Sequence, residues 1–331
     1  MKEEDIRPKE MKARFASLSK EDASKLLQNK NDFLNVLCPA CKSNAHKKAF
    51  IKEGYRFVVC EGCFTLFVNP RPTPLQLKKY YKESASWRYW GEVLFPKTEE
   101  KRRQAIFLPR AHRLMEIFKK YKFKPNRLVD VGAGYGIFCE EAKKLSLAKE
   151  IIAVEPCTSL AKACEEKGLC VINNTIEETN LNNIDVITCF ELVEHLFCPE
   201  RFLELCYNGL TKNGLLIITT INIDGFDLRI LGHLSENIAA PTHLNYFTIE
   251  SLTLLLRKVG FDVIEVQTPG KLDVDLVRKK ILGGQISKKE FPFMNYLLID
   301  KWDDVSSSLQ EFLVENKLSS HLWLVAKKAS E

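Results

Sequence analysis

Two pairs of cysteines near the N-terminus have the spacing of a metal site. Cys38 and Cys41 form one C-x-x-C pair, Cys60 and Cys63 form another, and eighteen residues separate the pairs. Two thiolates at this spacing turn around one metal ion, and two such pairs complete a closed tetrahedral site. We expect a structural Zn²⁺, with an iron–sulfur centre or a redox pair as alternatives. Because four thiolates leave no position for water, this metal should not be the catalyst.

A glycine-rich turn lies between a predicted strand and a predicted helix. Residues 130–136 read Asp-Val-Gly-Ala-Gly-Tyr-Gly, after the apolar pair Leu128-Val129 and before a helical pattern that starts at Ile137. Glycines at such a turn lack the Cβ atoms that would keep a ligand off the backbone, and the helix N-terminus behind them favours polar or anionic groups. The spacing differs from the G-x-G-x-x-G of dinucleotide enzymes. The turn therefore predicts a pocket for a nucleotide-like ligand.

Further predicted strands follow the glycine turn and alternate with helical segments. They cover residues 151–154, 170–172, 184–189 and 215–220. The strand over residues 151–154 ends at Glu155, where a carboxylate can accept the protons of ribose hydroxyls. Strands that alternate with helices indicate an α/β protein with a doubly wound parallel sheet.

Five segments in a fixed order connect the chain with a known family. They read VDVGAGYG, IIAVEP, ITCFELVEHL, the strand after TKNG, and HLNYFTIESLTLLLRKVGF, and they extend over about residues 126–268; HLWLVAKK follows near the C-terminus. With these segments the chain resembles the class I S-adenosylmethionine-dependent methyltransferases. The resemblance implies a Rossmann-like, doubly wound, mostly parallel seven-stranded sheet, here with a small N-terminal zinc ribbon. It also implies S-adenosylmethionine as the cofactor.

The resemblance assigns cofactor-binding roles to eight residues. Asp130 would hold the loop or receive the methionine amino group, and Glu155 would take the ribose hydroxyls. The three glycines would let the backbone approach the cofactor. Phe190 would lie along the cofactor, and Ile176 and Glu177 would border the adenine. Ordinary core packing is the alternative for Ile176 and Phe190. The eight are Asp130, Gly132, Gly134, Gly136, Glu155, Ile176, Glu177 and Phe190.

Two histidines are candidates for catalysis. A hydroxyl acceptor must lose a proton as it is methylated, and histidine suits that step near neutral pH. His195 follows the strand over 184–189, and on a helix starting there Glu191 could orient its imidazole. His243 lies in the long connection after the strand over 215–220, which overhangs the carboxyl ends of the strands. A hydrogen bond that only stabilises a loop is the alternative for each, and a tyrosine of the aromatic segment over 84–91, expected to be a loop, is a further candidate base.

The order of the segments predicts four parts and a substrate class. We expect an N-terminal helical segment over 1–35, the ribbon over 36–72, a helical lid or linker over 73–124, and the methyltransferase domain over 125–331. Together with the sequence TPGKLDVD at 268–275, this order resembles a bacterial group of zinc-ribbon methyltransferases linked to sugar or surface-polysaccharide biosynthesis. The resemblance implies O-methylation of a sugar that is nucleotide-linked or part of a polymer.

The charge distribution leaves a second substrate class open. Residues 36–125 carry 20 Lys or Arg against 7 Asp or Glu, and a basic module beside an active site attracts phosphate-bearing substrates. The alternative function is therefore an rRNA or tRNA base methyltransferase that holds RNA with the basic ribbon. A cofactor-binding adaptor without activity is a third reading.

Composition predicts the compartment. The opening sequence MKEEDIRPKEMKARF is charged and does not resemble a signal peptide, and seven cysteines outside the ribbon fall in predicted strands and helices. No apolar run approaches the roughly 20 residues that cross a bilayer. We expect a reduced, cytoplasmic protein without a membrane span. Its substrate would be a small molecule or glycan, with nucleic acid less favoured.

Overall fold

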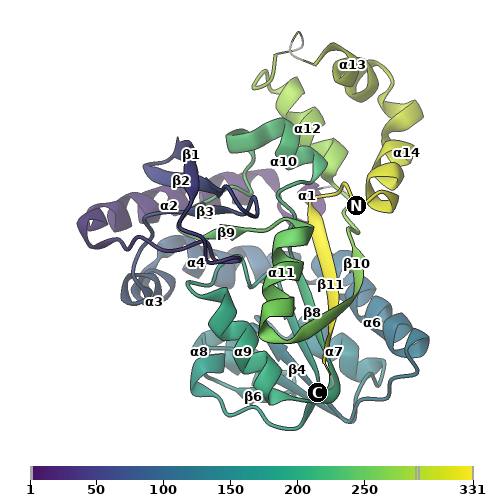
Figure 1. The fold of residues 1–331 in the computed structure, drawn as a ribbon. Helices are drawn as coiled ribbons and strands as arrows, with labels where there is room; N and C mark the ends of the chain where they lie inside the picture. Colours follow the sequence, from purple (N-terminus) through teal and green to yellow (C-terminus); the bar gives the residue numbers. More distant parts are fainter. Residues whose placement is uncertain (1–2, 288, 290, 330–331) are drawn as a thin grey trace.

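A seven-stranded sheet forms the centre of the protein in the computed structural model, which describes residues 3–329 except 288 and 290 (Figure 1). The strand order is β10-β11-β8-β7-β4-β5-β6. β4 to β8 pair in parallel, whereas β11 runs antiparallel to both of its neighbours. The predicted doubly wound, mostly parallel seven-stranded sheet is therefore confirmed. The strands are β4 (Arg127–Val131), β5 (Glu150–Val154), β6 (Cys170–Ile172), β7 (Ile184–Phe190), β8 (Leu210–Ile221), β10 (Phe261–Gln267) and β11 (His321–Lys328).

The alternation of side chains along β8 explains why helices cover both faces of this sheet. Leu215 and Ile217 join a buried cluster with residues of α6 and α7, whereas Leu216 and Ile218 join one with residues of α9 and α11. Successive side chains of a strand point to opposite faces, so an unbroken apolar run must be covered on both sides. The helices are α6 (Leu108–Lys120), α7 (Ile137–Lys144), α8 (Thr158–Glu166), α9 (Pro199–Gly209) and α11 (Ile249–Val259).

The segment before β4 is helical almost throughout. Thr73 caps α3 (Pro74–Glu83) in a capping box with Gln76. The expected aromatic loop over 84–91 is wrong, because α4 (Ala85–Tyr89) begins there with Ser84 as its N-cap and continues into a π-helical turn at Trp90–Leu94. Packing of Trp87 on Tyr81 of α3 and of Trp90 on Phe15 of α2 (Lys9–Leu27) offers a physical reason for the difference.

Two π-helical turns interrupt the helical segment that leads into β4. Trp90–Leu94 precedes α5 (Phe95–Arg102), and Arg103–Phe107 precedes α6. Pro96 and Pro109 stand just beyond these turns. Because proline has no N–H to donate to the carbonyl four residues earlier, the helix widens there instead of keeping its regular hydrogen bonds. Both prolines thus coincide with a local change from α-helical to π-helical hydrogen bonding.

A second, smaller sheet contains the ribbon and one strand from the second half of the chain. β1 (His46–Lys52), β2 (Tyr55–Cys60) and β3 (Leu66–Val68) are joined by β9 (Asn245–Tyr246), which lies on the connection after β8 (Figure 1). Leu66 pairs with Tyr246, and Phe67 pairs with Asn245. Ribbon residues also share a buried cluster with side chains of the large sheet, α9 and α11. The ribbon is therefore built into the rest of the protein.

Helices from both ends of the chain lie around the two sheets (Figure 1). The C-terminal group is α10 (Phe226–Leu231), α12 (Asp273–Leu282), α13 (Pro292–Asn295) and α14 (Trp302–Glu315), and the N-terminal pair is α1 (Glu3–Ile6) and α2 (Lys9–Leu27). No helix in the described part of the chain is both long and apolar enough to cross a membrane.

The TPGKLDVD sequence leads from β10 into α12, and its hydrogen bonds connect the start of α12 to the residues just before β11. The carboxylate of Asp273 accepts hydrogen bonds from the Ser319 hydroxyl at 2.7 Å and from the Ser320 N–H at 2.7 Å. A Cβ at Gly270 would overlap the Ser319 hydroxyl and the Asp273 carboxylate. This motif therefore has a structural role, because its glycine leaves the space in which the buried hydrogen bonds form.

Candidate active site

The glycine turn lies at the carboxyl ends of β4 and β5. Gly132, Gly134 and Gly136 all have positive φ, at 76°, 56° and 67°. A Cβ at Gly136 would collide with Leu169 and Cys164, whereas a Cβ at Gly134 would meet no atom within 4 Å. Gly136 is therefore required by packing, and Gly134 borders open space. A cofactor that approached the backbone at Gly134 would meet no side chain there.

Two buried carboxyl groups flank this turn. Asp130 accepts a hydrogen bond from the Thr188 hydroxyl at 2.6 Å, and Glu155 accepts from the backbone N–H groups of Gly134 and Cys157 at 2.8 and 2.9 Å. Burial raises the pKa of each carboxyl to about 7, although these hydrogen bonds favour the ionised form. Both groups thus titrate near neutral pH at the place where the sequence predicts the methionine and ribose contacts.

The remaining predicted cofactor residues lie in the core or on the surface. Ile176 is buried in the core cluster around β7 and α9, and Glu177 is exposed in a short 3₁₀ turn, Ile176–Glu178. The Phe190 ring packs against Phe138 and Trp323, with centroid distances of 4.7 and 5.6 Å. The structure places Ile176 and Phe190 in core contacts, and their contacts with a cofactor stay a prediction.

The chain after β7 turns sharply and forms no helix. Glu191 has a φ of 53°, and the His195 N–H donates to the Leu192 carbonyl at 3.0 Å. The expected helical pairing of Glu191 with His195 is therefore wrong. The Glu191 carboxylate instead accepts from Arg110 at 2.8 Å and from the Thr219 hydroxyl at 2.7 Å.

Arg110 and His321 also belong to the site, although no motif or spacing in the sequence indicates it. His321 lies 3.5 Å from the Glu191 carboxylate, and the Arg110 guanidinium lies 4.8 Å from the centre of the Phe190 ring. Burial alone would raise the pKa of Glu191, but His321 and Arg110 outweigh it and lower that pKa. An ionised carboxylate is thus held between β7, β8 and α6.

The two predicted catalytic histidines come together. The rings of His195 and His243 lie 4.7 Å apart. Nδ1 of His195 contacts the Thr242 carbonyl at 2.8 Å, and Nδ1 of His243 contacts the Asn237 carbonyl at 2.8 Å. Because a carbonyl oxygen only accepts, each Nδ1 carries the proton and each Nε2 keeps a free lone pair.

Burial keeps both imidazoles neutral. It lowers the pKa of His195 to about 3 and also lowers the pKa of His243. Each neutral ring keeps the unprotonated Nε2 that a general base requires, although a pKa of about 3 makes His195 a weak base. The sequence predicted these residues as bases, and the structure adds how their tautomers are held.

A third titratable group, Glu194, completes this cluster and was not expected from the sequence. A carboxylate oxygen of Glu194 and one ring nitrogen each of His195 and His243 lie within 4.8 Å of one another. Burial, with repulsion from Glu191, raises the pKa of Glu194 to about 8, and its carboxyl contacts the Thr220 hydroxyl at 2.8 Å. Two histidines and a carboxylate could hold a divalent ion. The same groups could also share a proton.

Aromatic side chains from α3 and α4 enclose the histidines. The Tyr81 hydroxyl donates to the Thr242 carbonyl at 3.1 Å, and the Trp87 ring lies 6.2 Å from that of His195. Trp90, in the π-helical turn after α4, packs on Phe15 of α2 at 5.2 Å. Burial raises the pKa of Tyr81, so its hydroxyl stays protonated and is a poor base.

A buried asparagine connects the two histidine-bearing segments to the ribbon. The Asn245 amide donates to the carbonyls of Val193 and Leu196 at 3.2 and 2.8 Å. Its side-chain oxygen accepts from Arg71 at 3.0 Å, and Arg71 also donates to the Phe197 carbonyl at 3.2 Å. Asn245 and Arg71 therefore hold the turn with His195 and the loop with His243 against the end of the ribbon.

The four ribbon cysteines have the arrangement of a closed metal site. The sulfur atoms of Cys38 and Cys63 lie 3.4 Å apart, as do those of Cys41 and Cys60, and all four lie within 4.8 Å of one another. Zn–S bonds of about 2.3 Å in a tetrahedron place the sulfur atoms about 3.8 Å apart. The four thiols thus fit the predicted structural Zn²⁺, which would bridge the hairpin and the loop before it.

Comparison with known proteins identifies the family. A family model described as a methyltransferase domain matches residues 99–266. The chain belongs to this methyltransferase family. The matched range begins in α5 and ends in β10, so it contains the glycine turn and both histidines.

Curated relatives are named ubiquinone biosynthesis O-methyltransferases. The protein of Bradyrhizobium diazoefficiens is 32% identical over 155 residues, which is 40% of this chain and 60% of that protein. The protein of Rhodopseudomonas palustris is 26% identical over 222 residues, 60% of this chain and 84% of that protein. The match to the first relative thus spans less than two thirds of its length.

Solved structures with a similar fold are also methyltransferases by name. One is the plantazolicin methyltransferase BpumL in complex with SAH, with a TM-score of 0.49 and 15% identity, covering 77% of this chain and 94% of that one. Another is an S-adenosylmethionine-dependent methyltransferase of Thermotoga maritima, with a TM-score of 0.44 and 18% identity, covering 71% and 98%.

The two carboxyl groups at the glycine turn predict a pH-dependent affinity for the cofactor. Their ionised forms accept hydrogen bonds from the ribose hydroxyls or attract the methionine ammonium, so cofactor binding should favour ionisation. With each pKa near 7, the dissociation constant of S-adenosylhomocysteine should rise on the order of tenfold per group as the pH falls from 8 to 6. Calorimetric titration at the two pH values measures this change.

Two variants of β5 distinguish this effect from a loss of structure at low pH. Glu155→Gln should bind more weakly at pH 8 and lose part of the pH dependence. Glu150→Gln, at the exposed start of the same strand, should behave like the parent. A Glu155→Gln protein with the parent's affinity and pH dependence would show that this carboxylate does not meet the cofactor.

The ribbon geometry predicts one zinc ion per chain. Cys60→Ser should release it and lower the melting temperature, because Cys60 lies in a core cluster shared with the large sheet. Elemental analysis of the purified protein measures the metal content, and Cys198→Ser, which changes an exposed cysteine outside the ribbon, is the control. Iron in place of zinc, or no metal at all, would contradict the assignment.

Proposed function

We propose that this methyltransferase transfers the methyl group of S-adenosylmethionine to a hydroxyl of a small molecule, with a sugar as the acceptor class. The observation that carries the proposal is the pair of neutral imidazoles at the carboxyl edge of the sheet. Each has its Nδ1–H fixed by a backbone carbonyl and its Nε2 free. A hydroxyl acceptor is the substrate that requires such a base.

The chemistry needs alignment and one proton acceptor. When bound, S-adenosylmethionine supplies an already activated methyl group. An O–C bond forms as the S–C bond breaks, the electron pair of that bond goes to sulfur, and the hydroxyl proton goes to Nε2 of a histidine. Residues of the protein therefore orient the hydroxyl, exclude water and hold the proton.

His243 is the better candidate for this base. The pKa of His195, at about 3, makes it a weak base, and its ring lies between His243 and the side chains of Tyr81 and Trp87. His195 would then orient His243 or the acceptor. Glu194 lies within reach of both rings, and its ionised form, which a pKa of about 8 leaves partly populated near neutral pH, could share the proton once it is on the histidine.

The acceptor class rests on two lines of support. The curated relatives are named O-methyltransferases, which favours a hydroxyl over an amine. The resemblance to a bacterial zinc-ribbon group linked to polysaccharide biosynthesis suggests a sugar, and Tyr81 and Trp87 offer flat apolar walls beside His195. A phosphate on that sugar would suit the basic charge of residues 36–125.

RNA is the less favoured acceptor. Lys119, Lys122 and Lys124 belong to the basic section of the sequence, yet they stand just before β4 begins at Arg127. The glycine turn follows the other end of that strand. These cations therefore lie at the opposite end of the strands from the acceptor site and cannot hold an RNA backbone beside it.

The proposed base predicts the effect of two substitutions. His243→Ala should lower kcat by about 100-fold or more, the usual contribution of general base catalysis, and leave S-adenosylhomocysteine affinity nearly unchanged. His195→Ala should lower kcat less. Because burial lowers the pKa of both rings, the acid limb of the parent's rate should lie below the ordinary histidine pKa of about 6.5 and vanish in the His243 variant. His112→Ala, on the exposed face of α6, is the control.

A methyl-labelling experiment tests the acceptor class with the same variants. Cell extract is incubated with tritiated S-adenosylmethionine and the protein, then separated into RNA, protein, polysaccharide and small-molecule pools. Label should enter the polysaccharide or small-molecule pool and depend on His243. Label in RNA, or full turnover in both histidine variants, would overturn the proposal.

A further inference from the structure

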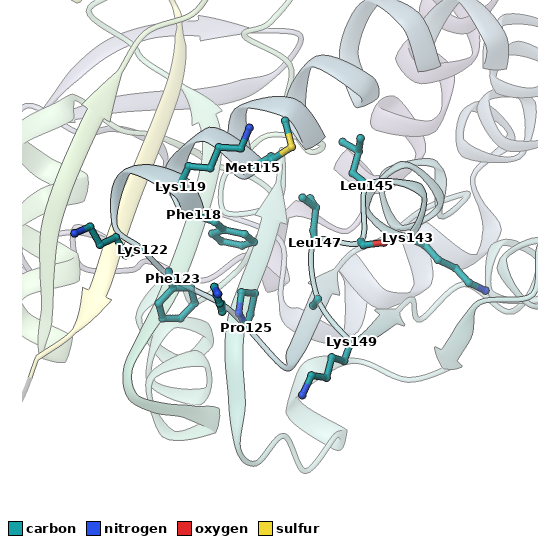
Figure 2. A pocket seen from close by; sticks show the side chains of 13 residues that line it. Met115, Phe118, Lys119, Lys122, Phe123, Pro125, Lys143, Leu145, Leu147 and Lys149 are labelled. Carbon is teal, nitrogen blue, oxygen red and sulfur yellow. The ribbon is translucent and has the colours of Figure 1, made fainter.

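A hollow of about 1050 Å³ opens at the amino ends of β4 and β5. The glycine turn lies at the opposite, carboxyl end of these strands. Figure 2 shows its apolar centre, formed by Phe118, Phe123, Pro125 and Leu147. Phe118 and Leu147 are each only 6% exposed, and the Phe123 ring packs on Phe118 at 5.8 Å. The floor is thus recessed and fixed by the core that α6 and α7 form against the sheet.

Five lysines form the rim, from the ends of α6 and α7 and the loops beside them. Figure 2 shows the side chains of Lys119, Lys122, Lys143 and Lys149 around the apolar centre, and no acidic side chain among the described residues lines the hollow. In the described residues, no carboxylate lies within ion-pair distance of any of them, and Lys143 contacts the carbonyl of Gly168. The five are Lys119, Lys122, Lys124, Lys143 and Lys149.

Neighbouring cations that do not line the hollow are paired. Lys120 contacts Glu265 at 2.6 Å, Lys144 contacts Glu141 at 2.7 Å, and Arg127 contacts Glu150 at 2.7 Å. The contrast shows that acidic residues are available in this region of the fold. They are placed beside the hollow and not in it.

Helix dipoles reduce this positive charge only in part. α6 and α7 both end at the hollow, and each C-terminus carries about half a negative charge. Lys119 and Lys143 lie in those last turns, where such cations are expected. Lys122, Lys124 and Lys149 lie beyond the helices, so they exceed what the dipoles require, and the hollow stays strongly positive.

We propose that this hollow is a docking surface for an acidic amphipathic segment of a partner protein. Its apolar side chains would enter the floor, and its carboxylates would pair with the rim lysines. A flat bilayer cannot reach a recessed floor, and a nucleic acid would find no hydrogen-bonding groups there to meet its bases. The floor and rim together therefore favour a segment with large apolar side chains on one face and acidic ones around them.

Fluorescence anisotropy with a designed probe tests this proposal. The probe is a labelled peptide of about 15 to 20 residues, long enough to form a helix, with Leu and Phe on one face and Glu elsewhere. It should bind the full-length protein, and more tightly at low salt. The K119E/K122E/K124E variant should bind it about tenfold more weakly or worse. The K30E/K47E/K48E variant, with the same change of charge at exposed sites, should bind like the parent.

Two further peptides separate charge from apolar contact. Replacing Glu by Gln, or Leu and Phe by Ser, should each weaken binding to the parent protein. Unchanged affinity for S-adenosylhomocysteine shows that the variants remain folded. The proposal is overturned if the acidic peptide does not bind the parent at low salt, if it binds the K119E/K122E/K124E variant equally well, or if only phosphatidylglycerol vesicles or RNA bind in a manner that this variant abolishes.

Discussion

The buried amide of Asn245 holds together three segments from distant parts of the sequence. It donates to two carbonyls of the turn after β7 and accepts from Arg71 at the end of the ribbon, while its own backbone pairs with β3. A buried carbonyl left without a donor costs about 1 to 3 kcal/mol, so these segments have a strong preference for this one arrangement. His195 and His243 lie on two of them. The acceptor side of the site therefore depends on the ribbon, although no ribbon residue is proposed to take part in the chemistry.

This dependence assigns different tasks to the two halves of the site. The proposed cofactor half is built from the glycine turn, Asp130 and Glu155, all at strand ends of the large sheet. The proposed acceptor half is built from the turn after β7 and the connection after β8, which also hydrogen-bond to Arg71 of the ribbon and Tyr81 of α3. In such an arrangement the strand ends provide a rigid cofactor pocket, and the loops and added segments determine the acceptor pocket. Proteins with the same sheet can therefore act on different substrates.

Much of the fold could be predicted because its signals are local. The apolar run before the glycine turn, the alternation of strands and helices and the C-x-x-C spacing all lie within short stretches of sequence, and β11 coincides with the expected HLWLVAKK strand. The acceptor site could not be predicted in the same way. Glu194, Arg110 and Asn245 act through contacts 26 to 174 residues apart, and the left-handed backbone at Glu191 breaks the helical spacing to His195. Burial then lowers the histidine pKa values, which spacing cannot reveal.

Amide hydrogen exchange in an Asn245→Asp variant tests the central claim most directly. The carboxylate keeps the pairing with Arg71 but cannot donate to the carbonyls of Val193 and Leu196. The account predicts faster exchange over residues 193–197 and 242–247, while β4 and β5 stay as protected as in the parent protein. Unchanged exchange in both loop segments would show that Asn245 does not hold the acceptor site in place.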